Sequence, residues 1–213
     1  MASGKTAVGQ QLARDLGYRL VDTGMMYRAL TCLALRRKLD VGDEAAVTAL
    51  AQGARIELGQ PANDGSTTIR IDGEDVTGDL RAPEVDRNVS YVSRIPGVRV
   101  AMVERQREFA RDGRLIMLGR DIGSVVLKDA PVKVYLDASP AERARRRHRE
   151  LAAAGVNRPE AEIRRELEQR DEMDRQRHVS PLKPAADAVI IDTDDLPLEA
   201  VIARVRELAG VSR

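Results

Sequence analysis

The sequence predicts an α/β fold in which a parallel sheet carries helices on both faces. Three observations lead to this prediction. Segments with helical spacing of apolar residues alternate with short apolar runs, of which Leu115–Leu118 is the clearest. A continuous run of this kind is typical of a strand buried on both faces. Gly4-Lys5-Thr6 opens the first helix, and such a triplet commonly follows a strand of a parallel sheet.

Composition excludes several classes of protein. The 213 residues suffice for one domain with small insertions. A formal net charge of +1 argues against a general nucleic-acid or membrane binder. One Phe, four Tyr and no Trp imply an aliphatic core and few stacking platforms for single-stranded nucleic acid. Cys32 is the only cysteine, so we expect no internal disulfide and no Cys/His metal cluster.

The amino-terminal triplet is the second half of a phosphate-binding loop. A helix is predicted over residues 5–16, followed by Gly17 as a left-handed cap. Backbone amides and the helix dipole attract phosphate oxygens at such an N-terminus. Lys5 would reach the β- and γ-phosphates of a nucleotide, and the hydroxyl of Thr6 would ligate Mg²⁺.

The first glycine of the pattern G-x-x-x-x-G-K-[ST] would lie before Met1, together with the strand that feeds the loop. We therefore expect the natural protein to start further upstream, with an intact mass above that of Met1–Arg213. If the chain does begin at Met1, the expectation is poor folding and weak ATP binding, because a central strand would be missing.

The first half of the chain continues with a strand over 18–21, a turn at 22–24 and a helix over 25–38. Asp43 is expected to cap a short helix. Alternating segments at 54–58 and 67–71, with a turn at 72–73 before Val76, predict an inserted, half-exposed antiparallel hairpin or three-stranded flap.

The second half returns to alternating helices and strands. Pro83 and Pro96 begin two helices, the second with Val100, Val103 and Phe109 inside. Buried strands are predicted at 115–118, 132–136 and 188–191. Helices begin at Ser139-Pro140, Pro159 and Pro197, and Gly155 breaks the first of these. Four core strands are thus visible, and the phosphate loop requires a fifth before Met1.

Two groups of charged residues are candidates for chemistry. Arg120 and Asp121 follow a buried strand, where open α/β sheets bind ligands. They could pair with each other, or bind a phosphate and a base or sugar. Arg170, Asp174 and Arg177 share one helical face, either as an ion-pair ladder or as a rigid surface presenting guanidinium groups to a ligand.

The segment 143–177 is rich in arginine and has three interpretations. It could be a solvated helical hairpin with ion pairs four residues apart, a nucleic-acid patch, or a lid that closes over a triphosphate. Arginine suits the third because its planar fork binds phosphate oxygens bidentately.

Taken together, the motifs resemble bacterial cytidylate kinases. The segments that carry this resemblance are Asp22-Thr-Gly-Met-Met-Tyr-Arg28, Leu118-Gly-Arg-Asp-Ile-Gly123, the segment 129–139, and Arg170-Asp-Glu-Met-Asp-Arg-Gln-Arg177. They occur in order over nearly the whole chain. The resemblance implies a P-loop nucleoside monophosphate kinase fold in a single domain over 1–213, with a β-containing nucleotide-binding insert at 38–89 and a helical lid at 143–168.

The resemblance also implies phosphoryl transfer from ATP, with Mg²⁺, to CMP or dCMP. It assigns catalytic roles to Lys5, Arg120 and Arg177 and metal binding to Thr6. The implied ATP-binding residues are Met1, Ala2, Ser3, Gly4, Lys5, Thr6, Ala7, Arg143 and Arg147. The implied acceptor contacts are Thr23 and Tyr27 near the acceptor; Arg28, Arg120 and Arg177 at its phosphate; Ser90, Arg99 and Asp121 at cytosine; and Arg170 and Asp174 at ribose.

A carboxylate at Asp121 favours cytosine over uracil, because it accepts from the 4-amino group and repels a 4-carbonyl. The alternatives are a kinase for UMP or another nucleoside monophosphate, or a nucleotide-binding protein impaired by the shortened loop. A nucleic-acid role for the cluster at 143–149 is a third. We expect a cytoplasmic monomer whose partners are ATP, CMP and dCMP, with no nucleic-acid or membrane partner.

Overall fold

A computed structural model describes residues 2–61, 67–177 and 179–210. It divides the chain into two compact units, one formed by Met1–Leu12 with Arg120–Arg213 and the other by Ala13–Gly119. The boundary falls within helix α1 (Lys5–Leu16). The organisation of the chain as a single domain stays a prediction.

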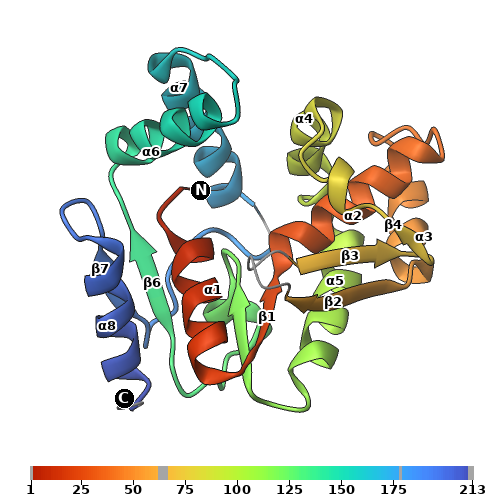
Figure 1. The fold of residues 1–213 in the computed structure, drawn as a ribbon. Helices are drawn as coiled ribbons and strands as arrows, with labels where there is room; N and C mark the ends of the chain where they lie inside the picture. The colour runs from red at the N-terminus through yellow and green to blue at the C-terminus, as the bar shows by residue number, and fades with distance from the viewer. Residues whose placement is uncertain (1, 62–66, 178, 211–213) are drawn as a thin grey trace. The chain divides into compact units, whose positions relative to one another are not determined.

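The unit Ala13–Gly119 is built around helix α2 (Thr23–Arg36; Figure 1). Nine residues of this helix are buried. Met26, Ala29 and Leu30 are completely excluded from solvent, and Cys32 lies among them at 3% exposure. The other elements of this unit are β1 (Arg19–Asp22), α3 (Glu44–Gly53), β2 (Ile56–Pro61), β3 (Thr67–Ile71), β4 (Glu74–Asp75), the 3₁₀ turn η1 (Thr77–Asp79), α4 (Pro83–Val92), α5 (Pro96–Ala110) and β5 (Leu115–Leu118).

Short polar side chains fix where the helices begin. The carboxylate of Asp22 accepts from the amide of Gly24 at 2.9 Å, so α2 starts at Thr23 and the predicted turn at 22–24 is its first turn. The predicted cap at Asp43 is confirmed, since its carboxylate accepts from the amide of Ala46 at 3.0 Å. Gly17 ends α1 in the left-handed conformation, at φ +62°.

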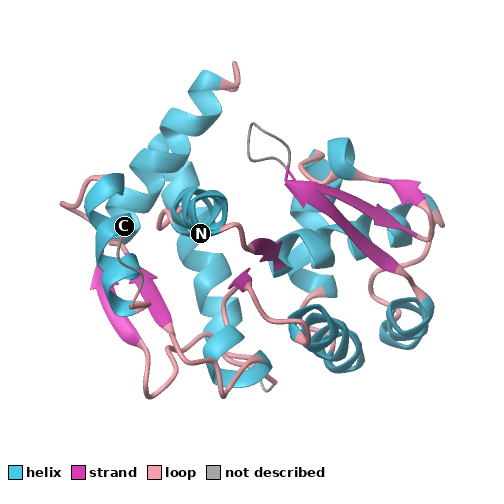
Figure 2. Cartoon of the chain, turned by 60° about the horizontal axis from the view of Figure 1, so that its bottom comes forward, coloured by secondary structure: helices cyan, strands magenta, loops and turns pink. Residues whose placement is uncertain are grey.

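The inserted flap is confirmed as a three-stranded antiparallel sheet in the order β2-β3-β4 (Figure 2). Ile69 and Ile71 point to one face and are fully buried, whereas Thr68 and Arg70 are exposed on the other. This alternation is what a sheet with one covered face requires. The third strand is Glu74–Asp75, so it ends before the predicted position at Val76.

The other unit contains strands β6 (Val134–Asp137) and β7 (Val189–Asp192), which pair in parallel (Figure 1). The side chain of Ser139 accepts from the amide of Glu142 at 3.2 Å and caps α6. The remaining elements of this unit are the π-helical turn η2 (Ile122–Val126), α6 (Pro140–Ala153), α7 (Glu160–Arg175) and α8 (Leu198–Leu208).

The α/β class with parallel strands is confirmed, but the four predicted core strands pair two by two. Among the described residues, β1 pairs only with β5 and β6 only with β7. Within each pair the strands end in register, with Asp22 opposite Leu118 and Asp137 opposite Asp192. In each pair the carboxyl ends of both strands therefore lie at the same edge, which is where parallel sheets bind ligands.

The predicted burial of β5 on both faces was wrong, and so was the predicted burial of β7. All four residues of β5 are only half-buried, and in β7 Val189 and Ile190 are 39% and 58% exposed. Neighbouring strands pair with the edges of a strand, whereas its faces are covered by the elements that pack on the sheet, and those elements leave these side chains partly open to solvent. Val100, expected inside α5, is also exposed at 57%, whereas Val103 is buried.

Candidate active site

The loop that precedes α1 has the backbone of an anion-binding turn. Ala2 and Gly4 adopt left-handed conformations, at φ +57° and +85°, and the helix begins at Lys5. Such a backbone turns successive amides toward one side, where the helix dipole also favours negative charge. Lys5 donates from Nζ to the buried hydroxyl of Ser3 at 3.0 Å. Thr6 and Ala7 are exposed on the first turn, and Met1 lies outside the described residues.

Four predicted site residues of this unit come together in a cluster of guanidinium groups. Asp174, on α7, is fully buried and pairs with both Arg120 and Arg177. Arg143, on α6, pairs with the buried carboxylate of Asp171, one turn before Asp174. The predicted face of α7 thus contacts the arginine that follows β5.

Positive charge exceeds negative charge in this cluster. Burial, together with the guanidinium groups of Arg170, Arg177 and Arg143, lowers the pKa of Arg120 to about 9, while Asp171 opposes them. The Nη2 of Arg120 and the Nε of Arg143 are buried and have no hydrogen-bond acceptor within the described ranges. Buried donors without an acceptor are costly, and an anion placed between them would satisfy both their hydrogen bonds and their charge.

Asp121, the predicted cytosine contact, follows Arg120 and is 8% exposed. Its carbonyl accepts from the amides of Val125 and Val126 at 2.9 and 3.3 Å, which opens the π-helical turn η2. Turns of this kind are rare and occur frequently at functional sites.

Five further predicted residues lie in the unit Ala13–Gly119. Thr23 donates to the carbonyl of Leu118 at 2.9 Å, which ties the ends of β1 and β5 together. Arg99 is 2% exposed, donates to the carbonyl of Ser93 at 3.1 Å and lies 5.7 Å from the ring centre of Tyr27. Ser90 is half-buried on α4, and Arg28 on α2 bonds to residues of the insert and of α4.

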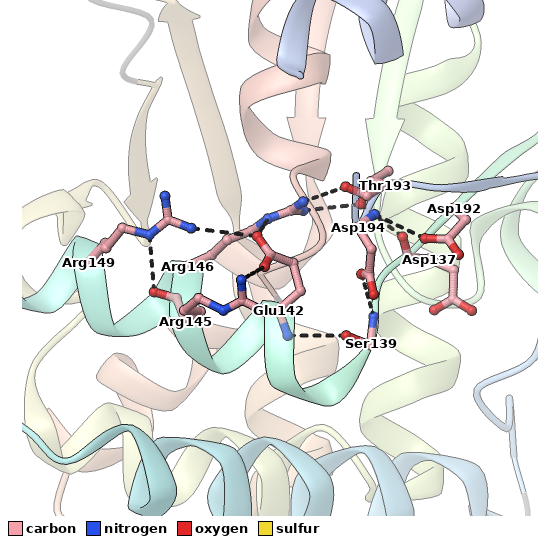
Figure 3. Close-up of polar contacts among 9 residues, drawn as sticks. All are labelled: Asp137, Ser139, Glu142, Arg145, Arg146, Arg149, Asp192, Thr193 and Asp194. Carbon is pink, nitrogen blue, oxygen red and sulfur yellow. Dashed lines mark hydrogen bonds and ion pairs between the residues drawn. The ribbon is translucent and has the colours of Figure 1, made fainter. Parts of the chain in front are cut away.

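Three of the five arginines of α6 pair with one carboxylate (Figure 3). Glu142, 8% exposed, pairs with Arg145 at 3.2 Å, Arg146 at 2.8 Å and Arg149 at 3.5 Å. Arg147, which was predicted to bind ATP, pairs with Glu150 at 3.1 Å. The second predicted lid arginine, Arg143, belongs to the buried cluster described above.

Arg146 is a candidate that sequence reasoning missed. It donates from Nη1 and Nη2 to the hydroxyl and carbonyl of Thr193 at 3.0 and 2.5 Å (Figure 3). Its Nη1 lies 4.0 Å from the position that a Cβ on Gly4 would occupy, beside the phosphate-binding turn. The spacing of four residues from Glu142 was a visible signal, but the contact with Thr193 was not.

The start of α6 is joined to the end of β7 by a further bond. The amide of Ser139 donates to the carboxylate of Asp194 at 2.7 Å (Figure 3). Hydrogen bonding from the side chain and the amide of Ser139 lowers the pKa of Asp194. Because β6 leads directly into α6, the segment after β7 and the segment after β6 are held together at the same sheet edge.

An anion-binding turn at a helix N-terminus and a buried guanidinium cluster, set in an α/β fold, are the features of a nucleotide phosphotransferase. A family model described as cytidylate kinase matches residues 1–210. The chain therefore belongs to the cytidylate kinase family, whose members are P-loop nucleoside monophosphate kinases. It is an enzyme that phosphorylates CMP and dCMP, with ATP as the phosphate donor.

Curated cytidylate kinases match this sequence over nearly the whole chain. The cytidylate kinase of Pelotomaculum thermopropionicum is 44% identical over 203 residues, which cover 95% of this chain and 89% of that protein. The cytidylate kinase of Chloroflexus aggregans is 47% identical over 94% of this chain and 86% of its own length. That of Roseiflexus castenholzii is 48% identical over 95% and 87%. Within the described part of the chain, no helix is both long and apolar enough to cross a membrane.

Proposed function

We propose that the guanidinium groups of Arg120, Arg143 and Arg177 bind the phosphate groups between which this kinase transfers a phosphoryl group. An oxygen of the CMP or dCMP phosphate attacks the γ-phosphorus of ATP, the bond to the β-phosphate oxygen breaks, and ADP leaves with the electron pair. The observation that carries this proposal is the excess of positive charge in the cluster, where four guanidinium groups lie with the two carboxylates of Asp171 and Asp174. Catalysis then consists mainly of positioning and of stabilising negative charge.

On the donor side, the turn at Ala2–Gly4 and Lys5 would hold the phosphates of ATP, with Ser3, Thr6 and Ala7 alongside. Thr6 offers an exposed hydroxyl, and no group of three His, Cys, Asp or Glu residues in the described ranges could hold a metal ion by itself. This arrangement fits Mg²⁺ bound through one hydroxyl, nucleotide oxygens and water. When bound, Mg²⁺ would neutralise charge on the β- and γ-phosphates.

On the acceptor side, Arg28, Arg120 and Arg177 would bind the phosphate of CMP, with Thr23 and Tyr27 near it. Arg170 and Asp174 would contact the ribose. Asp121, with Ser90 and Arg99, would select cytosine, because its carboxylate accepts from the 4-amino group. Arg143 and Arg147 would close over ATP as part of a lid at 143–168, and we add Arg146 to this set. We expect a monomer that acts on small nucleotides, without a nucleic-acid or membrane partner.

The experiment is a steady-state assay with ATP and Mg²⁺, in which CMP, dCMP, UMP and AMP are compared as acceptors. We expect the value of kcat/KM to be highest for CMP and dCMP. Arg120→Ala should lower it by about 10²- to 10³-fold, because a donor aimed at developing charge is lost. The matched control is Arg175→Ala, since Arg175 is exposed on the same helix as Asp174 and pairs only with Glu172 in the described residues.

The assignment of the cluster would be wrong if Arg120→Ala and Arg175→Ala had the same small effect. Circular dichroism of each variant shows whether it is folded. A folded chain that phosphorylates none of the four acceptors would contradict the proposed function itself.

A further inference from the structure

Arg28 is held in a defined orientation by two acceptors from outside its own helix. Its Nη1 donates to the carbonyl of Leu80 at 2.7 Å and pairs with Oδ1 of Asp86 at 2.6 Å. The Arg28 side chain is 16% exposed and that of Asp86 is 41% exposed, so the pair lies at the edge of the core. Both acceptors belong to the same compact unit as Arg28.

Both contacts use the same nitrogen of the guanidinium group. Among the described residues, no hydrogen bond or ion pair involves the Nε or Nη2 of Arg28. A guanidinium group is planar, so two acceptors on Nη1 restrict the orientation of the whole plane. The edge formed by Nε and Nη2 then remains available to bind two oxygens of one phosphate.

Asp86 also lies beside another residue of the proposed acceptor site. Asp86 and Ser90 are four residues apart on α4 and therefore share a face of that helix. The adjacent face of α4 buries Val85, Val89 and Val92 in the core. The packing of these valines fixes the position of α4, and with it the carboxylate that holds Arg28.

We propose that Asp86 is a positioning residue for the acceptor phosphate and acts through Arg28. This inference rests on the proposed function, in which Arg28 binds the phosphate of CMP. Without Asp86 the long Arg28 side chain keeps one anchor, the carbonyl of Leu80, and must be ordered when the phosphate binds. Ordering a side chain of this kind weakens binding, and it does so equally in the ground state and the transition state.

The test is the kinetics of Asp86→Ala with CMP as the varied substrate. We expect the KM for CMP to rise about two- to tenfold, with kcat and the KM for ATP unchanged. Asp86→Glu should recover part of the loss because it keeps the carboxylate. Glu74→Ala is the matched control: Glu74 lies in the same insert and pairs with Arg36 on α2 at 2.6 Å, not with Arg28. This control should leave the KM for CMP unchanged.

A double variant separates positioning from a general structural role. If Asp86 acts through Arg28, then Arg28→Ala combined with Asp86→Ala should have the same KM for CMP as Arg28→Ala alone. Additive effects would overturn the proposal. So would an unchanged KM in Asp86→Ala, or a lower one, which would mean that the carboxylate competes with the phosphate for Arg28.

Failure of this inference can be told apart from failure of the proposed function. If Arg28→Ala raises the KM for CMP and Asp86→Ala does not, only the role of Asp86 is refuted. If Arg28→Ala leaves the KM unchanged, the phosphate assignment of Arg28 fails and this inference fails with it. Should Asp86→Ala not fold, Asp86→Asn keeps the shape and an acceptor oxygen, and we expect a smaller rise in KM.

Discussion

The guanidinium group of Arg120 is charged at neutral pH, although its buried, positively charged surroundings disfavour that charge. Burial and three neighbouring guanidinium groups lower its pKa to about 9, far below the ordinary value of arginine. The unfolded chain therefore keeps this proton at pH values where the folded chain loses it. Hence this group lowers the stability of the ligand-free chain below pH 9, and the stability recovers as the pH rises from about 9 toward 12.

Binding of CMP should show the opposite dependence on pH. The charged form of Arg120 is the one that attracts a phosphate, so the affinity for CMP should fall as the pH rises through about 9. Calorimetric titrations at pH 8, 9 and 10 would measure this, and unfolding by urea at the same pH values would measure the stability. An affinity for CMP that is constant over this range would contradict a role for Arg120 in binding the phosphate.

Sequence reasoning identified the residues whose spacing is local. Arg170, Asp174 and Arg177 follow one another at helical intervals, and Asp174 does pair with Arg177. The contacts of Arg146 and Asp86 were not predicted, because their partners, Thr193 and Arg28, are far away in the sequence. Helical periodicity predicts which residues share a face of a helix, but it does not predict which distant residues that face contacts.

At the scale of elements, Gly97 allows α5 to approach α3 closely. A Cβ built on Gly97 would lie 3.0 Å from the Cβ of Thr48 and closer still to the two γ atoms. Thr48 is β-branched and lies in a helix, so its side chain has few alternative rotamers. The contact can therefore be relieved only by moving the helices apart.

We expect Gly97→Ala to lower the free energy of unfolding by about 1–3 kcal/mol, as overpacking does. Gly53→Ala is the matched control. Gly53 also lies in a helix, as the last residue of α3, and no atom lies within 4 Å of the added Cβ. The control should be neutral or stabilise the chain by up to about 1 kcal/mol. Urea unfolding of both variants measures the difference, and equal stabilities would show that α3 and α5 adjust without cost.

Helix boundaries were easier to predict than the environment of strands. Caps such as Asp43 and Ser139 act within three residues, and both bond as predicted. The apolar run Leu115–Leu118 was correctly predicted as a strand, but its burial was not, because burial depends on elements distant in the sequence. The division of the four core strands into two pairs is likewise a property of long-range pairing.

For the whole molecule, apolar burial is distributed unevenly between the two units. The main hydrophobic cluster extends from Val21 to Met102 and lies entirely within Ala13–Gly119. The cluster between α6 and α7 consists of Ala144, Ile163 and Leu167, with Leu151 packed against it. Regions with few buried apolar contacts open at low free energy.

Hydrogen exchange should therefore proceed at different rates in the two units. We expect the amides of α2 to exchange most slowly, at a rate set by global unfolding, and those of α6 and α7 to exchange faster by local opening. Exchange followed by mass spectrometry, with peptides that separate these helices, would measure both rates. Equal protection of α2 and α7 would mean that the chain opens as one cooperative unit.

The same core encloses the only thiol of the chain. Cys32 is 3% exposed, and burial raises its pKa, with Asp79 adding to the rise and Arg36 and Arg28 opposing it. Alkylating reagents attack the thiolate, so modification has to wait until α2 separates from its neighbours. The rate at which Cys32 is alkylated therefore measures how often this unit opens. This rate of alkylation, followed by mass, would report how a bound nucleotide slows the opening of this unit, without any added label.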